Sequence, residues 1–546
     1  MNAFFNSNKN KRKRAIPLFL LLSFFATYSN LAQGQQWGYV IFKDKGIHDN
    51  SYQSNFSPAA IERRLLQDIA WDERDVPVNN NYIVQVEAFS DSTFGTSRWL
   101  NALITKASAN NWEFISKLPC VKEIEFLEEH ALITAENSEP TSTYYESDYK
   151  KEEIQNQIEL LEPSQFNERE LNGKNTIIAV FDAGFTDADE VTQLKHLFKN
   201  NQVKATKDFL SKSNQVYSHS VHGTEVLTFL AGKNDSIQFG LATEATYLLA
   251  RVTPNIGFFR FLNDVQWIQA LEWAEENGAS LVNSSLSFTN QLYERKDLNG
   301  RTCKISIAAN TAMDKGILVV NAAGNEFQNS WEIIGAPADA ERILTVGSVN
   351  PKTGYVSSFS SIGPTADGRL KPDVCAPGEL IYPENDEYTR IQGTSFATPL
   401  VCGFAACVRQ LHPDWNTEKL WQEIRKSGSL HPYFDYAHGF GIPRASYFFF
   451  GKEEEPNVYS VQFNLDSLNC NNLLSISRSD SLEIEENYSA PVAFIQFVKA
   501  TGEVFKYNVS RPQNKIIASI PVEEFFGCKL RVVYDRHFFE IPIPQP

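Results

Sequence analysis

The sequence predicts an α/β fold with a doubly wound parallel sheet for residues 146–450, flanked by an α+β domain and a β-rich domain. Short apolar strands alternate with helical patterns through the middle of the chain, which is typical of a parallel sheet covered by helices on both faces. After about residue 451 the helical periodicity stops and β-rich segments follow. With 546 residues, the chain is long enough for about three domains of roughly 150 residues each.

Residues 1–34 have the pattern of a secretory signal peptide. Five basic residues within 9–14 precede an apolar run at 15–28, and small residues at 32–34 offer a cleavage site. The apolar run is too short to cross a bilayer, which takes about 20 apolar residues. A retained amphipathic anchor is the alternative. The pattern favours a secreted or cell-surface protein.

Residues 35–145 are predicted to form a small α+β domain that ends in a linker. The polar stretch 137–150 contains Pro and Ser and is typical of an exposed linker. The apolar patterns predict strands at 37–42, 82–86 and 121–126, and helices at 58–66 and 98–104.

Residues 146–450 carry the alternating pattern. One helix is expected at 264–277, with Asp264 as a candidate N-cap and Gly278 as its stop. In such sheets, sites form where strands end and loops begin. The predicted strands are 176–181, 247–252, 280–283, 317–320 and 343–349.

Residues 451–546 are predicted to form a small β-sandwich-like domain. The segments with β character are 492–498, 515–522 and 530–534.

Charge and cysteine content exclude several classes of function. The formal net charge is −16, and an acidic surface repels nucleic acid and anionic lipid. Seven cysteines are too sparse for a disulfide scaffold and too scattered for a zinc site, so no metal site and no required cofactor is expected. Cys470 and Cys528 are candidates for one disulfide, and the other cysteines are expected to be buried apolar residues.

Two short motifs supply an acid and a base. Asp182 directly follows the strand 176–181, where its carboxylate would accept a hydrogen bond from a histidine Nδ1 and fix the ring tautomer. His222 begins the phrase His-Gly-Thr before an apolar run at 226–230, and histidine suits proton transfer near neutral pH. Taken alone, each residue has a plain structural interpretation, as a turn residue or a polar residue at a helix start.

Two further motifs supply a hydroxyl and an amide. Ser395, in Gly-Thr-Ser-Phe-Ala-Thr-Pro, would begin a helix with its hydroxyl beside the positive helix end and its N–H available to an oxyanion. Asn325 follows the strand 317–320 in Asn-Ala-Ala-Gly-Asn and fits an oxyanion donor. The alternatives are a helix cap for Ser395 and a turn residue for Asn325.

Together, in the order Asp182, His222, Asn325 and Ser395, these phrases resemble the subtilases, the subtilisin-like serine peptidases. The resemblance spans the predicted α/β domain and includes Lys-Pro-Asp-Val-Cys-Ala-Pro-Gly at 371–378. It implies a sheet of subtilisin type and a secreted serine endopeptidase that hydrolyses peptide bonds in proteins through an acyl-enzyme. By this resemblance the nucleophile is the serine, the general base is the histidine, the orienting acid is the aspartate, and the asparagine binds the oxyanion.

The resemblance also implies where substrate binds. The segment 282–287 is similar to the family's substrate-binding edge, to which an extended peptide adds as a strand. Ser287 and Phe288 stand where small glycines are common, and a pocket narrowed by them would favour small substrate side chains. The expected substrate contacts are Ser285, Leu286, Ser287 and Gly324.

The flanking domains have weaker resemblances. Residues 35–145 resemble a subtilase propeptide, which assists folding and acts as an intramolecular inhibitor until it is cleaved, here near 137–150; a permanent N-terminal binding domain is the alternative. Residues 451–546 resemble sorting domains of the type IX secretion route, so that secretion machinery is an expected partner. A carbohydrate- or protein-binding sandwich is the competing interpretation.

Other classes of function stay open. One is a catalytically silent subtilase scaffold that binds partners, and another is a cell-surface adhesin that acts through residues 451–546. The α/β-hydrolase class is excluded, because Ser395 is not in Gly-x-Ser-x-Gly and the histidine precedes it. Structural calcium is open and unassigned, because Ca²⁺ sites built from backbone oxygens leave no sequence pattern.

Overall fold

The structure is a computed structural model that describes most of the chain. The described residues are 35–48, 50–127, 151–254, 262–289, 293–384, 387–450, 459–464, 472–478, 492–512, 515–520, 525, 527–535 and 537–543. The predicted signal peptide 1–34, the linker 137–150 and Cys470 therefore lie outside the described residues. Among the helices of the described parts, none is long and apolar enough to cross a membrane.

The chain divides into two compact units. Of the described residues, the first comprises 35–46, 78–96 and 101–127. Its antiparallel sheet has the order β2-β3-β1-β4 and packs around Val40, Leu103 and Trp112. The elements are β1 (Gln36–Phe42), α3 (Asn80–Glu87), β2 (Ser92–Ser97), β3 (Ala102–Ala107), α4 (Ala109–Ser116) and β4 (Val121–Phe126).

Two of the predicted elements in this part of the chain are wrong. The strand predicted at 82–86 is helix α3, whose N-cap Asn79 accepts a hydrogen bond from the Asn81 N–H and which buries Val86. The helix predicted at 98–104 is a turn that leads into strand β3, because Ala102 and its neighbours pair with β1. In both cases tertiary contacts override the local pattern of apolar residues.

The second unit contains the predicted parallel sheet. Its seven strands are β5 (Ile177–Asp182), β6 (Val203–Asp208), β7 (Thr246–Arg251), β8 (Leu281–Ser284), β9 (Leu318–Ala322), β10 (Leu344–Val349) and β11 (Val374–Pro377). The order is β11-β10-β9-β8-β5-β7-β6, and every pair is parallel. The strand order reverses on the two sides of β5, which makes its carboxyl end a topological switch point.

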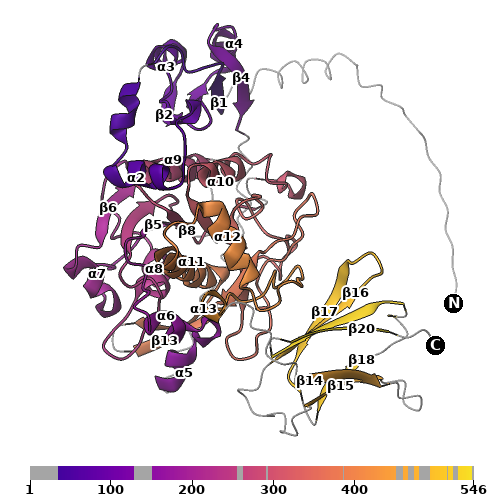
Figure 1. The fold of residues 1–546 in the computed structure, drawn as a ribbon. Helices are drawn as coiled ribbons and strands as arrows, with labels where there is room; N and C mark the ends of the chain where they lie inside the picture. Colours follow the sequence, from indigo (N-terminus) through magenta and orange to yellow (C-terminus); the bar gives the residue numbers. More distant parts are fainter. Residues whose placement is uncertain are drawn as a thin grey trace, which may run out of the picture. The chain divides into compact units, whose positions relative to one another are not determined.

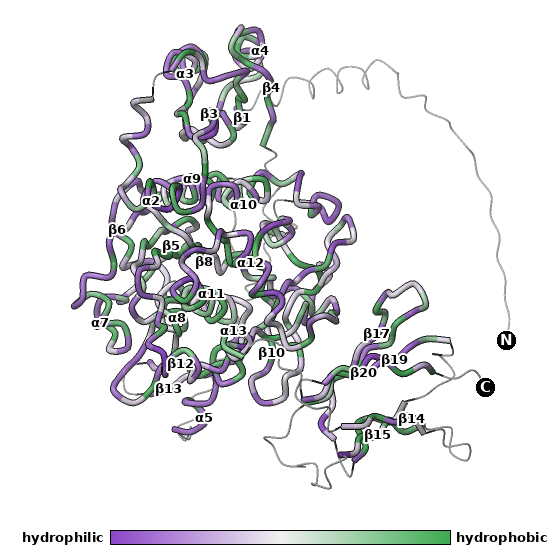
Figure 2. The backbone as a smooth tube through the Cα atoms, viewed as in Figure 1, coloured by the Kyte–Doolittle hydropathy of each residue, from purple (hydrophilic) through white to green (hydrophobic). Residues whose placement is uncertain are grey.

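Helices cover both faces of this sheet (Figure 1). Along β5, Ile178 and Val180 face one core cluster, whereas Ala179 and Phe181 face the other, as the two-residue period of a strand requires. The first cluster includes α8 (His222–Ala231) and α11 (Thr394–Leu411), and the second includes α9 (Asn263–Glu276) and α10 (Lys304–Asp314). Apolar segments accordingly run through the centre of this region (Figure 2). The predicted doubly wound α/β class is confirmed.

Helix α9 matches the helix predicted at 264–277 closely. It begins at Asn263 after Leu262, so Asp264 lies in the first turn and is not the N-cap. Gly278 follows the helix with φ of +86°, a left-handed conformation that ends the helix at little cost for glycine. Cysteines 120, 303, 375, 402 and 407 are buried, as predicted.

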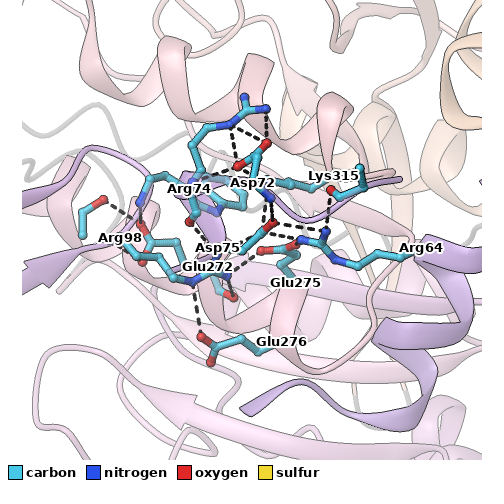
Figure 3. A network of polar contacts seen from close by, with 12 residues as sticks. Arg64, Asp72, Arg74, Asp75, Arg98, Glu272, Glu275, Glu276 and Lys315 are labelled. Atoms are coloured by element: carbon cyan, nitrogen blue, oxygen red, sulfur yellow. Dashed lines mark hydrogen bonds and ion pairs between the residues drawn. The ribbon is translucent and has the colours of Figure 1, made fainter. Parts of the chain in front are cut away.

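Part of the predicted N-terminal domain belongs to the second unit. Residues Ile47–Pro77 and Ser97–Leu100 cluster with the parallel-sheet region, and they include α2 (Pro58–Leu66). Buried ion pairs join Arg64 and Arg98 to Glu275 of α9, and Arg64 and Lys315 also pair with Asp75 (Figure 3). This ionic cluster (Arg63, Arg64, Asp75, Arg98, Glu272, Glu275 and Lys315) ties the segment 47–77 to helices α9 and α10.

The C-terminal region forms antiparallel sheets, as predicted. One sheet has the order β14-β15-β18 and the other β17-β16-β19-β20. Leu474 and Ile517 of the first sheet share an apolar cluster with Ile495 and Leu530 of the second. The strands are β14 (Tyr459–Asn464), β15 (Asn472–Arg478), β16 (Ala493–Val498), β17 (Val504–Ser510), β18 (Ile516–Ile520), β19 (Lys529–Tyr534) and β20 (His537–Pro542).

Candidate active site

The predicted site residues lie at the carboxyl ends of neighbouring strands. Asp182 is the last residue of β5, Ser285 follows β8, and Asn325 lies in the loop after β9. Because β5, β8 and β9 are adjacent and parallel, their carboxyl ends meet at one edge of the sheet. The site is therefore built at the switch point, where the loops of successive strands diverge.

Asp182 and His222 form a hydrogen-bonded pair. The Asp182 side chain is fully buried, and its two carboxylate oxygens lie 2.9 and 3.0 Å from Nδ1 of His222. The N–H of Ala183 also donates to Asp182, at 2.7 Å. His222 begins helix α8, and 14% of its side chain is exposed. With Nδ1 held by the carboxylate, Nε2 is left to accept a proton.

Ser395 lies in the first turn of α11 and contacts the segment after β8. Its Oγ donates to the Ser285 carbonyl at 3.3 Å, and the Ser285 hydroxyl donates to the Ser395 carbonyl at 2.8 Å. Among the described residues, no hydrogen bond joins Ser395 to His222. The hydroxyl is therefore bonded to Ser285 and not to the histidine.

Asn325 is held through its carbonyl oxygen. Its Oδ1 accepts hydrogen bonds from the Thr394 N–H and the Thr394 hydroxyl, both at 2.9 Å. The same hydroxyl accepts from the Gly324 N–H at 3.3 Å. Because the oxygen end of the amide is fixed in this way, the Nδ2 end is left as a donor. An amide oriented like this can stabilise a developing negative charge.

Charged groups around His222 shift its pKa upward. Burial by itself lowers the pKa, but the charge and the hydrogen bond of Asp182, together with the charge of Glu225, raise it above the usual value. Glu225 lies one turn further along α8, and burial, together with the charges of Asp182 and Glu384, raises its pKa to about 7 although His222 acts in the opposite direction. Glu225, one turn from His222, therefore changes charge near neutral pH.

Sequence comparison identifies the family of this arrangement. A sequence profile described as the subtilase family matches residues 173–441, and a second profile, described as the Peptidase S8 propeptide domain of Bacteroidota, matches residues 38–143. The chain belongs to the subtilase family. The resemblance inferred from the four motifs is confirmed.

Known relatives of this subtilase include bacterial peptidases. Subtilisin NAT of Bacillus subtilis subsp. natto is 28% identical over 301 residues, which cover 53% of this chain and 71% of the relative. Serine protease AprX of Bacillus subtilis (strain 168) is 28% identical over 324 residues, which cover 54% of this chain and 66% of the relative. The crystal structure of MycP1 without its N-terminal propeptide aligns with 54% of this chain and 95% of its own at 21% identity and a TM-score of 0.42.

The predicted substrate contacts of this subtilase occupy two neighbouring segments. Leu286 is buried in the core, and its carbonyl accepts from the Asn321 side chain at 3.0 Å. Phe288, predicted with Ser287 to narrow the pocket, is fully buried in the same core cluster as Trp331. The Phe288 ring is thus part of the core.

Thr394 and Glu225 are site residues to which the sequence assigned no role. Thr394 directly precedes Ser395, and only the fold shows that its hydroxyl bridges Gly324 and Asn325. Glu225 stands three residues after His222, a spacing that places both on one helix face and could have indicated the contact.

In the described part of this subtilase, no group of three or more His, Cys, Asp or Glu side chains is placed to hold a metal ion. Structural calcium remains an unassigned hypothesis.

Proposed function

We propose that this subtilase is a secreted serine endopeptidase in which Asp182, His222 and Ser395 form the catalytic triad. The observation that carries the proposal is the buried Asp182 carboxylate bonded to Nδ1 of His222, since it fixes the tautomer whose Nε2 accepts a proton. Within the described residues, the hydrogen bonds of the Asp182 carboxylate go to this histidine and to the Ala183 N–H.

The reaction proceeds in two acyl-transfer steps. The Ser395 hydroxyl leaves the Ser285 carbonyl, transfers its proton to Nε2 of His222 and attacks the peptide carbonyl carbon. The tetrahedral oxyanion is bound by Nδ2 of Asn325 and the Ser395 N–H. His222 then gives the proton to the leaving amine, and an acyl-enzyme remains. Water, deprotonated by the same histidine, releases the acid and restores Ser395.

The substrates are proteins and peptides, and the chain's own N-terminal region is the inhibitor. Membership of a peptidase family with a matching propeptide domain supports both statements. The ionic cluster that joins the segment 47–77 to α9 and α10 supports tight association of this region with the peptidase. Maturation then requires cleavage near residues 137–150. The C-terminal sheets would serve recognition by secretion machinery, in line with a secreted or cell-surface location.

A catalytically silent scaffold is the competing function. It is disfavoured because the hydrogen bonds that orient the site are intact. Asp182 is bonded to Nδ1 of His222, and the Thr394 N–H donates to Oδ1 of Asn325. A site without catalytic function would not require these hydrogen bonds.

The proposal is tested by comparing wild type with Ser395→Ala for self-cleavage near residues 137–150 and for hydrolysis of an unfolded protein. We expect only the wild type to mature and to degrade the substrate. Ser236→Ala, a change at an exposed serine in the segment after α8, is the matched control and should behave as wild type. Equal behaviour of wild type and Ser395→Ala would contradict the proposal.

A further inference from the structure

Arg251 is a buried arginine beside the Asp182–His222 pair, and the mechanism described above gives it no role. It is the last residue of β7, and in the parallel register its Cα is the partner of the Asp182 Cα at the end of β5. Only 7% of Arg251 is exposed. A buried guanidinium is costly unless its donors are bonded, so its partners show what it holds in place.

Two hydrogen bonds fix this guanidinium. Nη1 donates to Oδ2 of Asp208 at 3.0 Å, in an ion pair between two buried side chains. Nε donates to the backbone carbonyl of Ala183 at 2.9 Å. The Asp208 carboxylate is itself held, because it accepts from the N–H groups of Leu210 and Ser211. The guanidinium thus has a fixed position from which it bonds to the residue directly after Asp182.

The turn that begins at Ala183 contacts both members of the pair or their neighbours. The Ala183 N–H donates to the Asp182 carboxylate at 2.7 Å. The Gly184 carbonyl accepts from the N–H of Gly223, which directly follows His222, at 3.1 Å. The approach at Gly223 is close, since a Cβ there would lie 2.2 Å from the Gly184 carbonyl oxygen. A shift of this turn would therefore move the carboxylate and the start of α8 relative to each other.

We propose that Arg251 is a positioning residue, which anchors the Ala183 carbonyl and thereby holds the Asp182 carboxylate against Nδ1 of His222. This proposal rests on the proposed peptidase function and deepens it, because it concerns the same site. Arg251 acts on the reaction only through the pair. A displacement of about 1 Å in a catalytic geometry can lower the rate about 100-fold, so loss of this anchor is expected to affect kcat.

The first test is Arg251→Met, which keeps an unbranched side chain and removes every donor. Per active site, titrated with a covalent serine-directed inhibitor, kcat on one peptide is expected to fall about 10-fold or more, with KM within about twofold of wild type. Arg251→Lys keeps a cation that can donate to the Ala183 carbonyl and should recover most of the lost kcat. Asp208→Asn is a milder variant that loosens the same guanidinium and should also lower kcat.

Lys371→Met is the matched control. Lys371 is also buried and pairs with the carboxylate of Asp373 at 2.6 Å. Asp373 directly precedes β11 and accepts from the Thr345 N–H near the start of β10, so this pair lies at the amino ends of the strands. Asp182 lies at the opposite edge of the same sheet. Each Met variant loses a buried cation, but only Arg251→Met is expected to lower kcat per active site.

A second measurement requires neither self-cleavage nor activity. In the full chain with Ser395→Ala, proton NMR follows the Nδ1 proton of His222 that is bonded to Asp182. We expect Arg251→Met to shift or broaden this resonance and Lys371→Met to leave it unchanged.

Three outcomes would overturn the proposal while leaving the peptidase function intact. They are a wild-type kcat per active site in Arg251→Met or in Asp208→Asn, an equal fall of kcat in Lys371→Met, and an unchanged His222 resonance in Arg251→Met. A wild type that cleaves neither peptide nor unfolded protein would instead show that the proposed function fails.

Discussion

At the scale of single residues, the oxyanion donor depends on a neighbour that makes no contact with substrate in the proposed mechanism. Thr394 fixes Oδ1 of Asn325 through its N–H and its hydroxyl, and only the hydroxyl can be removed by substitution. We expect Thr394→Val to lower kcat about 10-fold with little change in KM, which corresponds to the loss of one hydrogen bond. Thr394→Ser should restore kcat, because it keeps the hydroxyl. Steady-state kinetics on one peptide decides this.

The kcat of Asn325→Ala is the reference with which the kcat of Thr394→Val is compared. Loss of an oxyanion donor typically lowers kcat by about 10² to 10³. A Thr394→Val variant that fell as far as Asn325→Ala would indicate a role of Thr394 beyond positioning.

The pH dependence of activity is also set by a single residue. In the proposed mechanism His222 must be neutral to accept the serine proton, so its raised pKa places the acid limb of the kcat/KM profile at higher pH. The negative charge of Glu225 contributes to this rise. We expect Glu225→Gln to lower the pKa of His222 and to move the acid limb to lower pH. Glu244→Gln, at an exposed position distant in sequence, is the control. A shift to higher pH would contradict this account.

At the scale of elements, the ionic cluster joins α2 to α9 through buried charges. Burial alone would raise the pKa of Glu275, but the guanidinium groups of Arg98, Arg63 and Arg64 hold it below its usual value. Glu275 is thus a carboxylate that stays charged inside the protein because three cations surround it. Removing one partner of such a group leaves the others buried without compensation.

We therefore expect Glu275→Gln to destabilise the full chain by about 3–5 kcal/mol. The background is Ser395→Ala, so that self-cleavage does not interfere. Asp314→Asn is the matched control, because Asp314 also pairs with arginines but a third of its side chain is exposed, and its expected loss is about 0–1 kcal/mol. Urea unfolding, monitored by tryptophan fluorescence, measures the free energy of unfolding of both variants. Equal losses would mean that the buried cluster contributes no more than a surface ion pair.

At the scale of the whole molecule, the large apolar cores of the peptidase region and of the C-terminal sheets use separate stretches of the described chain. The buried residues of the two clusters around the parallel sheet end at Ala445, and those of the C-terminal sheets begin at Tyr459. A smaller apolar cluster is shared by both stretches, because Leu430 packs with Phe494 and Val533. Each large core is thus complete within its own stretch, whereas the shared cluster is not.

We expect a chain that ends at residue 450 to mature and to hydrolyse unfolded protein within about threefold of the full chain, since neither large core is cut. The measurement is hydrolysis per active site, titrated with a covalent serine-directed inhibitor. Loss of hydrolysis with the chain still folded would mean that the C-terminal sheets take part in the peptidase function.

The sequence by itself determined the parallel-sheet class and placed four site motifs in order, because the hydrophobic period and the motifs are local. Only the tertiary structure decided that 82–86 is a helix and that residues 102–107 form a strand, since their partners lie elsewhere in the chain. It also revealed the Thr394 contact with Asn325. Such features depend on which distant segments pack together, and that information is absent from any local pattern.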